Sequence, residues 1–488
     1  MSVSNTNAPL ALPRSHRQAW RALWQLGWPI IFQSLLAASL GLVDTLMVGG
    51  VGPAALGGVG LVSRLLFVLT MVLAGLASGT GAVVAQYAGA GRLRATRGPV
   101  TLAVAVGLLL TVPMLLVSLF GAEPLAHLLG PDREVAAAAA IFLRWGAPIA
   151  PLCAITLTLA AVLRSSGNTR TPMWAGLAAL GLNTLLNLLF INGHFGMPAF
   201  GVAAAAAATG CARLLEVVWL MMALAPGPLH RLLKSVRRRD WHQMLQVAVP
   251  LMLKEVAWAG GILASTLIIS RMGQLPLAAF NLVLPVEGVL ISVVAGSGVA
   301  TGILLGHALG RAAFEDAFRC AEQLRRLISR SAFGVGVALA LLLATLRQSD
   351  FLATVIAPEL RHPTFDALAV LCLGFGARAH NTIVSVGILR SGHDTRWLFW
   401  IDLCSMWLVN VPMVTVAALI LHWPLAAVVG VMLLEEILKV GVFRWRVRSG
   451  RWLRRIGTPD GAGRCRQRTK TPVVSFQKTS PLEQRDSL

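Results

Sequence analysis

A single acidic side chain, Asp44, stands in the otherwise apolar, small or hydroxylated stretch LAASLGLVDTLMVGG. In a bilayer an ionised side chain costs roughly 2.5 kcal/mol or more, so such a residue is expected to face a cavity or a partner on another helix. The position therefore predicts a functional carboxylate. A carboxylate that is merely capped by a neighbouring helix is the alternative.

Two amides and a hydroxyl are candidate partners for this carboxylate. Asn183 and Asn187 in LGLNTLLNLLFI are four residues apart, so they share one face of a helix. Thr209 lies in the next apolar segment, in AAAAAATGC. Hard oxygen ligands of these types suit a small hard cation, and the same carboxylate can hold a proton. The four residues predict a site that binds Na⁺ or H⁺, although asparagines also join membrane helices without any further role.

Glu255, His380 and Asn381 are secondary candidates. Glu255 lies in VPLMLKEVAWAGG beside Lys254, and adjacent residues on a helix do not face each other, so we expect Lys254 to be a poor partner. His380 precedes Asn381, and a histidine titrates near neutral pH. For Glu255 a tie to another helix stays open as the alternative, and for His380 such a tie is the favoured interpretation.

Other charges also fall within apolar segments. Arg213 and Glu216 are three residues apart and Glu435 and Lys439 four apart, which predicts a neutralising pair along each helix. The sequence offers no evident partner for the remaining charges of this kind, Arg271, Glu287, Arg378 and Asp402.

The elements that carry these residues are long and apolar. Of 488 residues 56% are hydrophobic and 13% charged, with a mean hydropathy of +0.71, which indicates an all-α membrane protein. We expect twelve transmembrane helices. They run approximately over residues 28–48, 56–84, 100–120, 135–163, 173–191, 200–224, 247–269, 277–305, 327–346, 365–389, 397–421 and 424–443.

The net charge of +21 is distributed unevenly among the connections. Every second connection is basic, as are the leader and the tail, whereas those between them are poor in charge or mixed in sign. The positive-inside rule then places both termini in the cytoplasm. This one-sided distribution makes a nucleic-acid partner unnecessary, and the positive charge of the tail favours contact with anionic membrane lipid.

The chain contains an internal repeat. Pro29 and Pro250 are 221 residues apart, as are Gly89 and Gly310. VLRSSGNTR, which ends at Arg170, is echoed 226 residues later by ILRSGHDTR. Six helices per copy make the copies parallel, related by a pseudo-two-fold axis along the membrane normal.

The repeat divides the chain into five parts. We expect a cytoplasmic leader (1–24), an N-lobe of helices 1–6 (25–224), a cytoplasmic linker (225–244), a C-lobe of helices 7–12 (245–445) and a basic, disordered cytoplasmic tail (446–488).

The sequence gives little support for an enzyme. No nucleophile with a base, no HExxH and no other metal-ligand spacing lies within the apolar segments. The six cysteines suggest no disulfide framework. We therefore expect no catalysis and no cofactor.

Several motifs, in order, resemble the multidrug and toxic compound extrusion (MATE) family. They are GWPIIFQSLLAASLGLVDTLMVGGVGPAALGG, VVAQYAGAGR, LRSSGNTRTP, LNTLLN, LLGHALGR and LRSGHDTR. The resemblance covers about residues 25–445. It implies a twelve-helix antiporter with two lobes, in which Asp44, Asn183, Asn187 and Thr209 match the N-lobe cation site. Glu255 matches an acid of helix 7 used in one branch, whose acid in helix 10 is replaced here by Ala379, His380 and Asn381.

The resemblance implies export of cationic or amphiphilic drugs and toxic compounds in exchange for Na⁺ or H⁺, by alternating access, from the cell (inner) membrane. We expect small-molecule substrates, coupling through the N-lobe and a monomer. A lipid or polysaccharide flippase of the same superfamily is the alternative, but such proteins use cavity bases, and here acids are more evident. A channel is poorly motivated, since no filter segment is visible.

Overall fold

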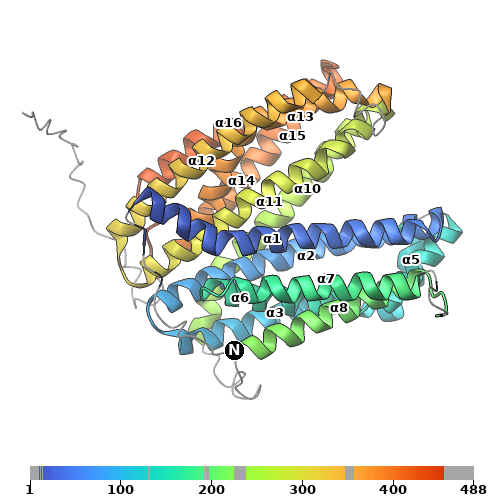
Figure 1. Ribbon diagram of the computed structural model, residues 1–488, viewed down its shortest axis with the longest axis horizontal. Coiled ribbons are helices and arrows are strands. Elements are labelled where there is room, and N and C mark those ends of the chain that lie inside the picture. Colours follow the sequence, from blue (N-terminus) through green and yellow to red (C-terminus); the bar gives the residue numbers. More distant parts are fainter. Residues whose placement is uncertain are drawn as a thin grey trace, which may run out of the picture.

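The computed structural model describes residues 10, 12–13, 15–129, 132–191, 193, 197–224, 238–346 and 357–455, and this part of the chain is helical without any strand. Figure 1 shows two bundles that lie close together at one end and diverge toward the other. The all-α prediction is therefore confirmed.

The first bundle is formed by α1 (His16–Gly49), α2 (Pro53–Gly89), α3 (Arg97–Phe120), α4 (Ala122–Leu129), α5 (Arg133–Trp145), α6 (Ile149–Ser165), α7 (Arg170–Phe190) and α8 (Val202–Ala223). The second is formed by α10 (Arg238–Ser270), α11 (Gln274–Gly310), α12 (Phe314–Leu346), α13 (Pro358–Thr382), α14 (Thr395–Cys404), α15 (Val411–Thr415) and α16 (Leu425–Arg448), with π-helical turns at Ile383–Leu389, Ser405–Asn410 and Val416–Ile420.

The repeat is visible in the two longest helices, α2 and α11, which have 37 residues each. Gly52 and Gly273 precede them with φ of 146° and 118°, a backbone region that favours glycine. Pro53 then fills the first turn of α2, where its missing N–H leaves no hydrogen bond unmade. Both copies of the repeat thus begin this long helix directly after a glycine of positive φ.

Nine helices of the described residues are long and apolar enough to cross a membrane, and the bent pair α5 and α6 makes a tenth. The two remaining predicted spans correspond to α1 and α16, which are helices of 34 and 24 residues. Three charged residues of α16, Glu435, Glu436 and Lys439, lower its hydropathy. Twelve spans therefore stay a prediction.

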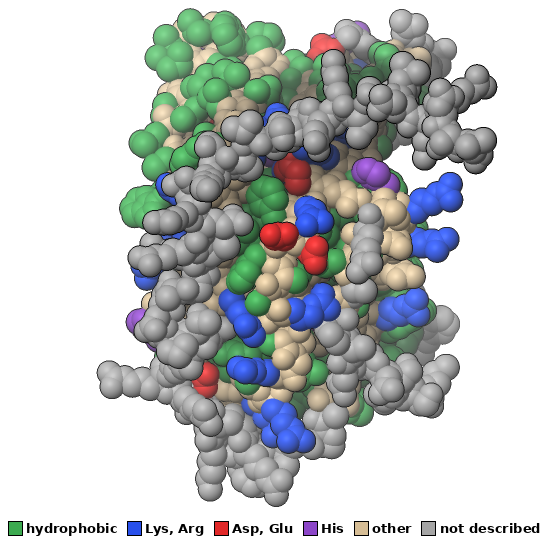
Figure 2. Space-filling view, turned by 90° about the vertical axis from the view of Figure 1, so that its left-hand side faces the viewer, with side chains coloured by type: hydrophobic (Ala, Val, Ile, Leu, Met, Phe, Trp, Pro, Cys, Tyr) green, Lys and Arg blue, Asp and Glu red, His purple; other side chains and the backbone are tan. Residues whose placement is uncertain are grey.

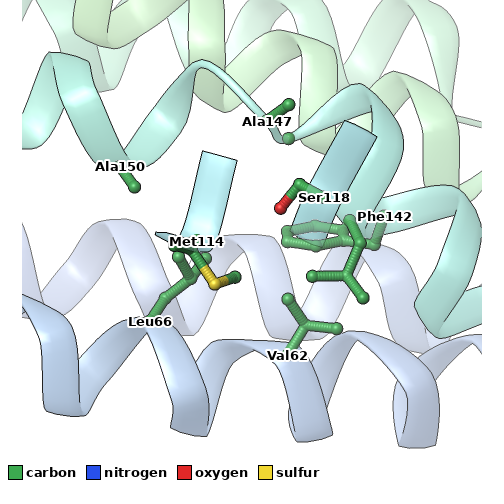
Figure 3. Close-up of a pocket in the computed structure, with 9 residues that line it drawn as sticks. Val62, Leu66, Met114, Ser118, Phe142, Ala147 and Ala150 are labelled. Atoms are coloured by element: carbon green, nitrogen blue, oxygen red, sulfur yellow. The ribbon is translucent and has the colours of Figure 1, made fainter. Parts of the chain in front are cut away.

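The predicted fourth span is divided in two. α5 and α6 meet at an angle of 53°, because Gly146 ends the first helix and Pro148 precedes the second. Figure 3 shows that this bend borders a small, mostly apolar pocket inside the bundle. Its labelled residues are Val62, Leu66, Met114, Ser118, Phe142, Ala147 and Ala150.

Two of the hydrogen bonds that join the bundles where they converge come from equivalent residues of the repeat. The Gln86 amide donates to the Ser391 carbonyl at 2.8 Å, and the Nε2 of His307 lies 2.9 Å from the Ser165 carbonyl. A carbonyl only accepts, so Nε2 of His307 carries a proton. Gln86 and His307 are repeat equivalents, as are the two serines, so each bundle binds the other in the same way. We call these four residues the junction.

Both ends of the described chain pack on the junction. The carbonyl of Leu10 accepts from Arg311 at 2.8 Å, and its N–H points to Nδ1 of His307 at 3.5 Å. The carbonyl of Arg454 accepts from Gln86 at 3.0 Å. The junction is therefore covered by one segment from each end of the described chain.

We predict that Gly310→Ala weakens the junction. A methyl group there would collide with the backbone carbonyl of Gln86, and overpacking of this kind costs about 1–3 kcal/mol. We expect a lower midpoint of thermal unfolding in detergent. Gly441→Ala is the control, because that glycine lies on α16 with no neighbouring atom within 4 Å, and equal midpoints for the two variants would contradict the prediction.

Candidate functional site

Three helices bring the four N-lobe candidates together. α1 supplies Asp44, α7 supplies Asn183 and Asn187 one turn apart, and α8 supplies Thr209. The Asn187 amide donates to Oδ1 of Asp44 at 2.6 Å and to Oδ1 of Asn183 at 3.1 Å. The Asn183 amide in turn donates to the Thr209 hydroxyl at 3.2 Å. We call these four residues the N-lobe cluster.

Two oxygens of the N-lobe cluster have incomplete hydrogen bonding. The Thr209 hydroxyl has one proton, and the Ala205 carbonyl at 2.9 Å is a nearer acceptor than Oδ2 of Asp44 at 3.4 Å. The Asn187 amide group faces the carboxylate, which leaves its own Oδ1 buried with no hydrogen-bond partner in the described part of the chain. A bound cation or water would satisfy these oxygens, whereas a purely structural cluster leaves them unexplained.

The cluster holds its carboxylate among neutral groups. Within the described residues Asp44 forms no ion pair, and the nearby Arg213 is paired with Glu216 at 2.8 Å, as their spacing predicts. Asn183 and Asn187 are fully buried. An acid in such surroundings is neutralised best by a proton or a small cation.

The second bundle neutralises its acids in another way. Lys254 lies 3.2 Å from Glu255 and 3.7 Å from Asp402, so the expectation that Lys254 is a poor partner is wrong. The four-carbon stem of lysine lets the ammonium turn back to an adjacent residue. Lys439 contacts Glu435 at 2.8 Å, which confirms the pair predicted along that helix.

Three charges without evident partners in the sequence are paired across helices. Arg378 on α13 contacts Glu287 on α11, and it lies 3.8 Å from Glu436 on α16. Asp402 on α14 lies 3.7 Å from both Lys254 and Lys439. The sequence analysis missed Glu436, although it stands next to Glu435, because spacing along one helix does not reveal contacts with another.

His380 and Asn381 belong to the same bundle and lie apart from the N-lobe cluster. Nε2 of His380 is 2.9 Å from a guanidinium nitrogen of Arg325. An arginine only donates, so this ring nitrogen accepts and the histidine is neutral. Asn381 donates to the carboxylate of Glu436 at 2.6 Å. Both residues thus connect helices, which for His380 is the favoured interpretation of its sequence.

No group of three or more His, Cys, Asp and Glu side chains in the described ranges is arranged to hold a metal ion. The five cysteines that the structure describes are free thiols: Cys153, Cys211, Cys320, Cys372 and Cys404. The N-lobe cluster, with one carboxylate and three neutral side chains, is therefore the strongest candidate for a reversible ion site.

Long apolar helices in two repeated bundles define the class of the protein as a multi-pass α-helical membrane protein. The family model described as MatE matches residues 29–189 and 250–416, which is more than half of the chain. The chain therefore belongs to the MATE family, as its motifs predicted, and it resides in the cell (inner) membrane.

Relatives match along most of their length. The uncharacterized transporter YisQ of Bacillus subtilis is 23% identical over 448 residues, which cover 90% of this chain and 95% of YisQ. The probable multidrug resistance protein NorM of Bradyrhizobium diazoefficiens is 28% identical over 419 residues, covering 83% and 87%. The multidrug resistance protein PmpM of Pseudomonas aeruginosa is 26% identical over 426 residues, covering 83% and 86%.

Solved structures share the fold. A MOP superfamily transporter from Pyrococcus furiosus superposes with a TM-score of 0.79 at 18% identity, covering 92% of this chain and 99% of that one. The bent form of the Vibrio cholerae MATE transporter VcmN gives a TM-score of 0.78 at 20% identity, covering 90% and 99%. The arrangement of two helical bundles is thus common to these proteins.

We predict that Thr209→Val destabilises the protein and Thr209→Ser does not. Valine has the shape of threonine but gives the Asn183 amide no acceptor, and an unsatisfied buried group costs about 1–3 kcal/mol. Serine keeps the hydroxyl. Thermal unfolding in detergent measures both variants, and similar midpoints would show that these hydrogen bonds contribute little.

Proposed function

We propose that this protein is a secondary active antiporter that exports cationic or amphiphilic drugs and toxic compounds in exchange for Na⁺ or H⁺. The observation that carries the proposal is the N-lobe cluster. It holds a carboxylate with neutral hydrogen-bond partners, and two of its oxygens have incomplete hydrogen bonding. The names of NorM and PmpM, multidrug resistance proteins, support substrates of this kind. The exchanged ion is cargo, and no cofactor is required.

A lipid or polysaccharide flippase of the same superfamily is a weaker proposal. Anionic headgroups need unpaired bases in the transport path. Arg378, a base that could serve, is occupied by Glu287 and lies near Glu436. We therefore favour small cationic or lipophilic substrates and a protein that works as a monomer.

We propose twelve spans with both termini in the cytoplasm. The N-lobe would comprise residues 25–224 and the C-lobe 245–445. In support, Figure 2 shows many Lys and Arg side chains, and fewer acids, on the end where the bundles converge, which fits contact with cytoplasmic-leaflet lipid.

Helices extend past the boundaries of these lobes. α1 begins at His16, inside the proposed leader (1–24), and α10 begins at Arg238, inside the proposed linker (225–244). Residues 225–237 of the linker and 456–488 of the proposed tail (446–488) lie outside the described residues.

Ion and substrate would compete through the charge of Asp44. A bound Na⁺ or proton neutralises this carboxylate, whereas its loss leaves an anion that favours a cationic substrate or a different lobe arrangement. α1 carries Asp44 and packs on α7 in its own bundle and on α11 in the other. Pro29 interrupts the hydrogen bonds of α1 and is a point where it can bend. Occupancy of one site can thus alter the contact between lobes.

Alternating access would require the junction to open. The hydrogen bonds from Gln86 and His307 close the converging end, while the bundles diverge at the other end in Figure 1. This arrangement suits a state that is closed toward the cytoplasm. An ion gradient would drive the cycle because the two states bind the ion with different affinity.

We predict that one ion gradient drives efflux and that Asp44→Asn abolishes it. Ethidium is followed in preloaded proteoliposomes while a Na⁺ gradient or a pH gradient is imposed alone. The asparagine keeps the shape of the side chain but removes the charge that the ion neutralises. Glu315→Gln, on an exposed residue of α12, is the control and should transport normally.

The same assay separates the two candidate functions. If neither gradient moves several cationic dyes although the protein is in the membrane, the antiporter proposal fails. Labelled lipid is then added to one leaflet, and its transfer would support the flippase.

We predict that breaking both hydrogen bonds of the junction opens the cytoplasmic side. The double variant Gln86→Leu with His307→Leu removes both donors, whereas His307→Gln keeps an amide donor like that of its repeat equivalent. Ser391→Cys, in a background without other cysteines, reports access because Ser391 is buried and only its backbone carbonyl makes the bond. We expect faster labelling by an impermeant maleimide in the double variant alone. Equal labelling rates in all variants would contradict the prediction that the junction closes the cytoplasmic side.

A further inference from the structure

The second bundle contains five acidic side chains that all lie close to a base. In sequence order they are Glu255, Glu287, Asp402, Glu435 and Glu436. The bases are Lys254, Arg378 and Lys439. The ion pairs form a continuous chain across α10, α11, α13, α14 and α16.

Lys439 occupies the centre of this chain. Its ammonium nitrogen lies 2.8 Å from Oε1 of Glu435, 3.6 Å from Oε1 of Glu436 and 3.7 Å from Oδ1 of Asp402. Three carboxylates from two helices thus surround one positive charge. An ammonium is a compact point charge with three donors, which suits such a position.

The surrounding acids also contact other groups, while Oε1 of Glu435 has no hydrogen bond in the described part of the chain beyond its contact with the ammonium. Asp402 also contacts Lys254 at 3.7 Å, and Glu436 accepts from Asn381 at 2.6 Å and lies 3.8 Å from Arg378. All three acids are at most partly exposed. Partly buried charges of one sign repel unless a counter-charge stays with them, and here three bases of the chain provide part of it for five acids.

The N-lobe cluster differs from this arrangement. Among the described residues Asp44 forms no ion pair, its hydrogen-bond partners are neutral, and the carbonyl oxygen of Asn187 has no hydrogen-bond partner. An ion can therefore enter or leave the N-lobe cluster. In the second bundle the positive charge is covalently attached and remains throughout a cycle.

We propose that the Lys439 ammonium is a built-in cation that fills the place among Asp402, Glu435 and Glu436 which a free Na⁺ or proton would otherwise take. With Lys439 in place, these three carboxylates then bind no exchangeable ion. The corollary that the exchanged ion binds only at Asp44 rests on the proposed antiport function.

The test is cation-dependent stability in a background without the N-lobe charge. Thermal unfolding of full-length Asp44→Asn protein in detergent is measured in NaCl and in choline chloride at equal ionic strength, and at pH 8 and pH 6. Lys439→Gln is then added, with Lys439→Arg as the variant that keeps the charge and Arg319→Gln as a control on an exposed base.

We expect the unfolding midpoint of the Lys439→Gln double variant to be lower in choline at pH 8 and to rise with Na⁺ or with acid by roughly 2 °C or more, since a ligand that binds only the folded state stabilises it. Asp44→Asn alone, and its combinations with Lys439→Arg or Arg319→Gln, should show a smaller response.

Three results would overturn the proposal. An Asp44→Asn protein that already responds to Na⁺ as strongly as the Lys439→Gln double variant would mean that the second bundle takes an ion with Lys439 in place. A Lys439→Gln midpoint that falls without recovery by Na⁺ or acid would make Lys439 a structural ion pair only. An unfolding midpoint of the Lys439→Gln double variant equal to that of Asp44→Asn would mean that the ammonium does not compensate the three carboxylates.

Ethidium efflux by the wild-type protein is measured separately and tests antiport. Failure of efflux with a positive stability result would reject the antiporter and leave the role of Lys439 intact.

Discussion

The cost of an uncompensated charge among apolar helices governs the interior of this protein. Every acid there must be neutralised by a partner, a proton or an ion. The second bundle uses bases of its own, such as Lys439 among three carboxylates. The N-lobe cluster gives Asp44 only amide and hydroxyl donors. That difference leaves Asp44 as the acid whose charge would depend on what is bound, and this dependence is the physical basis of the coupling that we propose.

The internal repeat shows how the two copies diverged. The repeat equivalent of Asp44 is Ser265, which is buried and lies 3.4 Å from the amide oxygen of Asn410. The second bundle thus has a neutral polar pair where the first has its carboxylate. The acid of the second bundle on α10, Glu255, lies ten residues before Ser265. Lys254 connects it to Asp402 on α14. The two copies of the repeat therefore differ: the first has an acid without an ion pair among the described residues, and the second has acids that lie close to bases.

The sequence was most informative where one helix carries the whole pattern. Asn183 and Asn187, one turn apart, lie on one buried face, and Lys439 meets Glu435 within α16. Resemblance to the MATE family linked these segments to Asp44. Contacts between helices, such as that of Arg378 with Glu287, cannot be predicted from the spacing of residues along one helix. The break between α5 and α6 had a signal, Gly146 with Pro148, but an uninterrupted apolar run concealed it.

The ion pairs of the second bundle also limit where a movement of the lobes can begin. Ion pairs that cross five of its helices resist their separation, because pulling one pair apart exposes charges without partners. α1 has no such restraint at Asp44, and it packs on both α7 and α11. A change of charge at Asp44 therefore acts first on α1, the helix that lies between the lobes. The junction contains no ion pair among the described residues, and its two hydrogen bonds run between side chains and carbonyls. The lobes are thus expected to move as units about α1, with the second bundle keeping its internal packing.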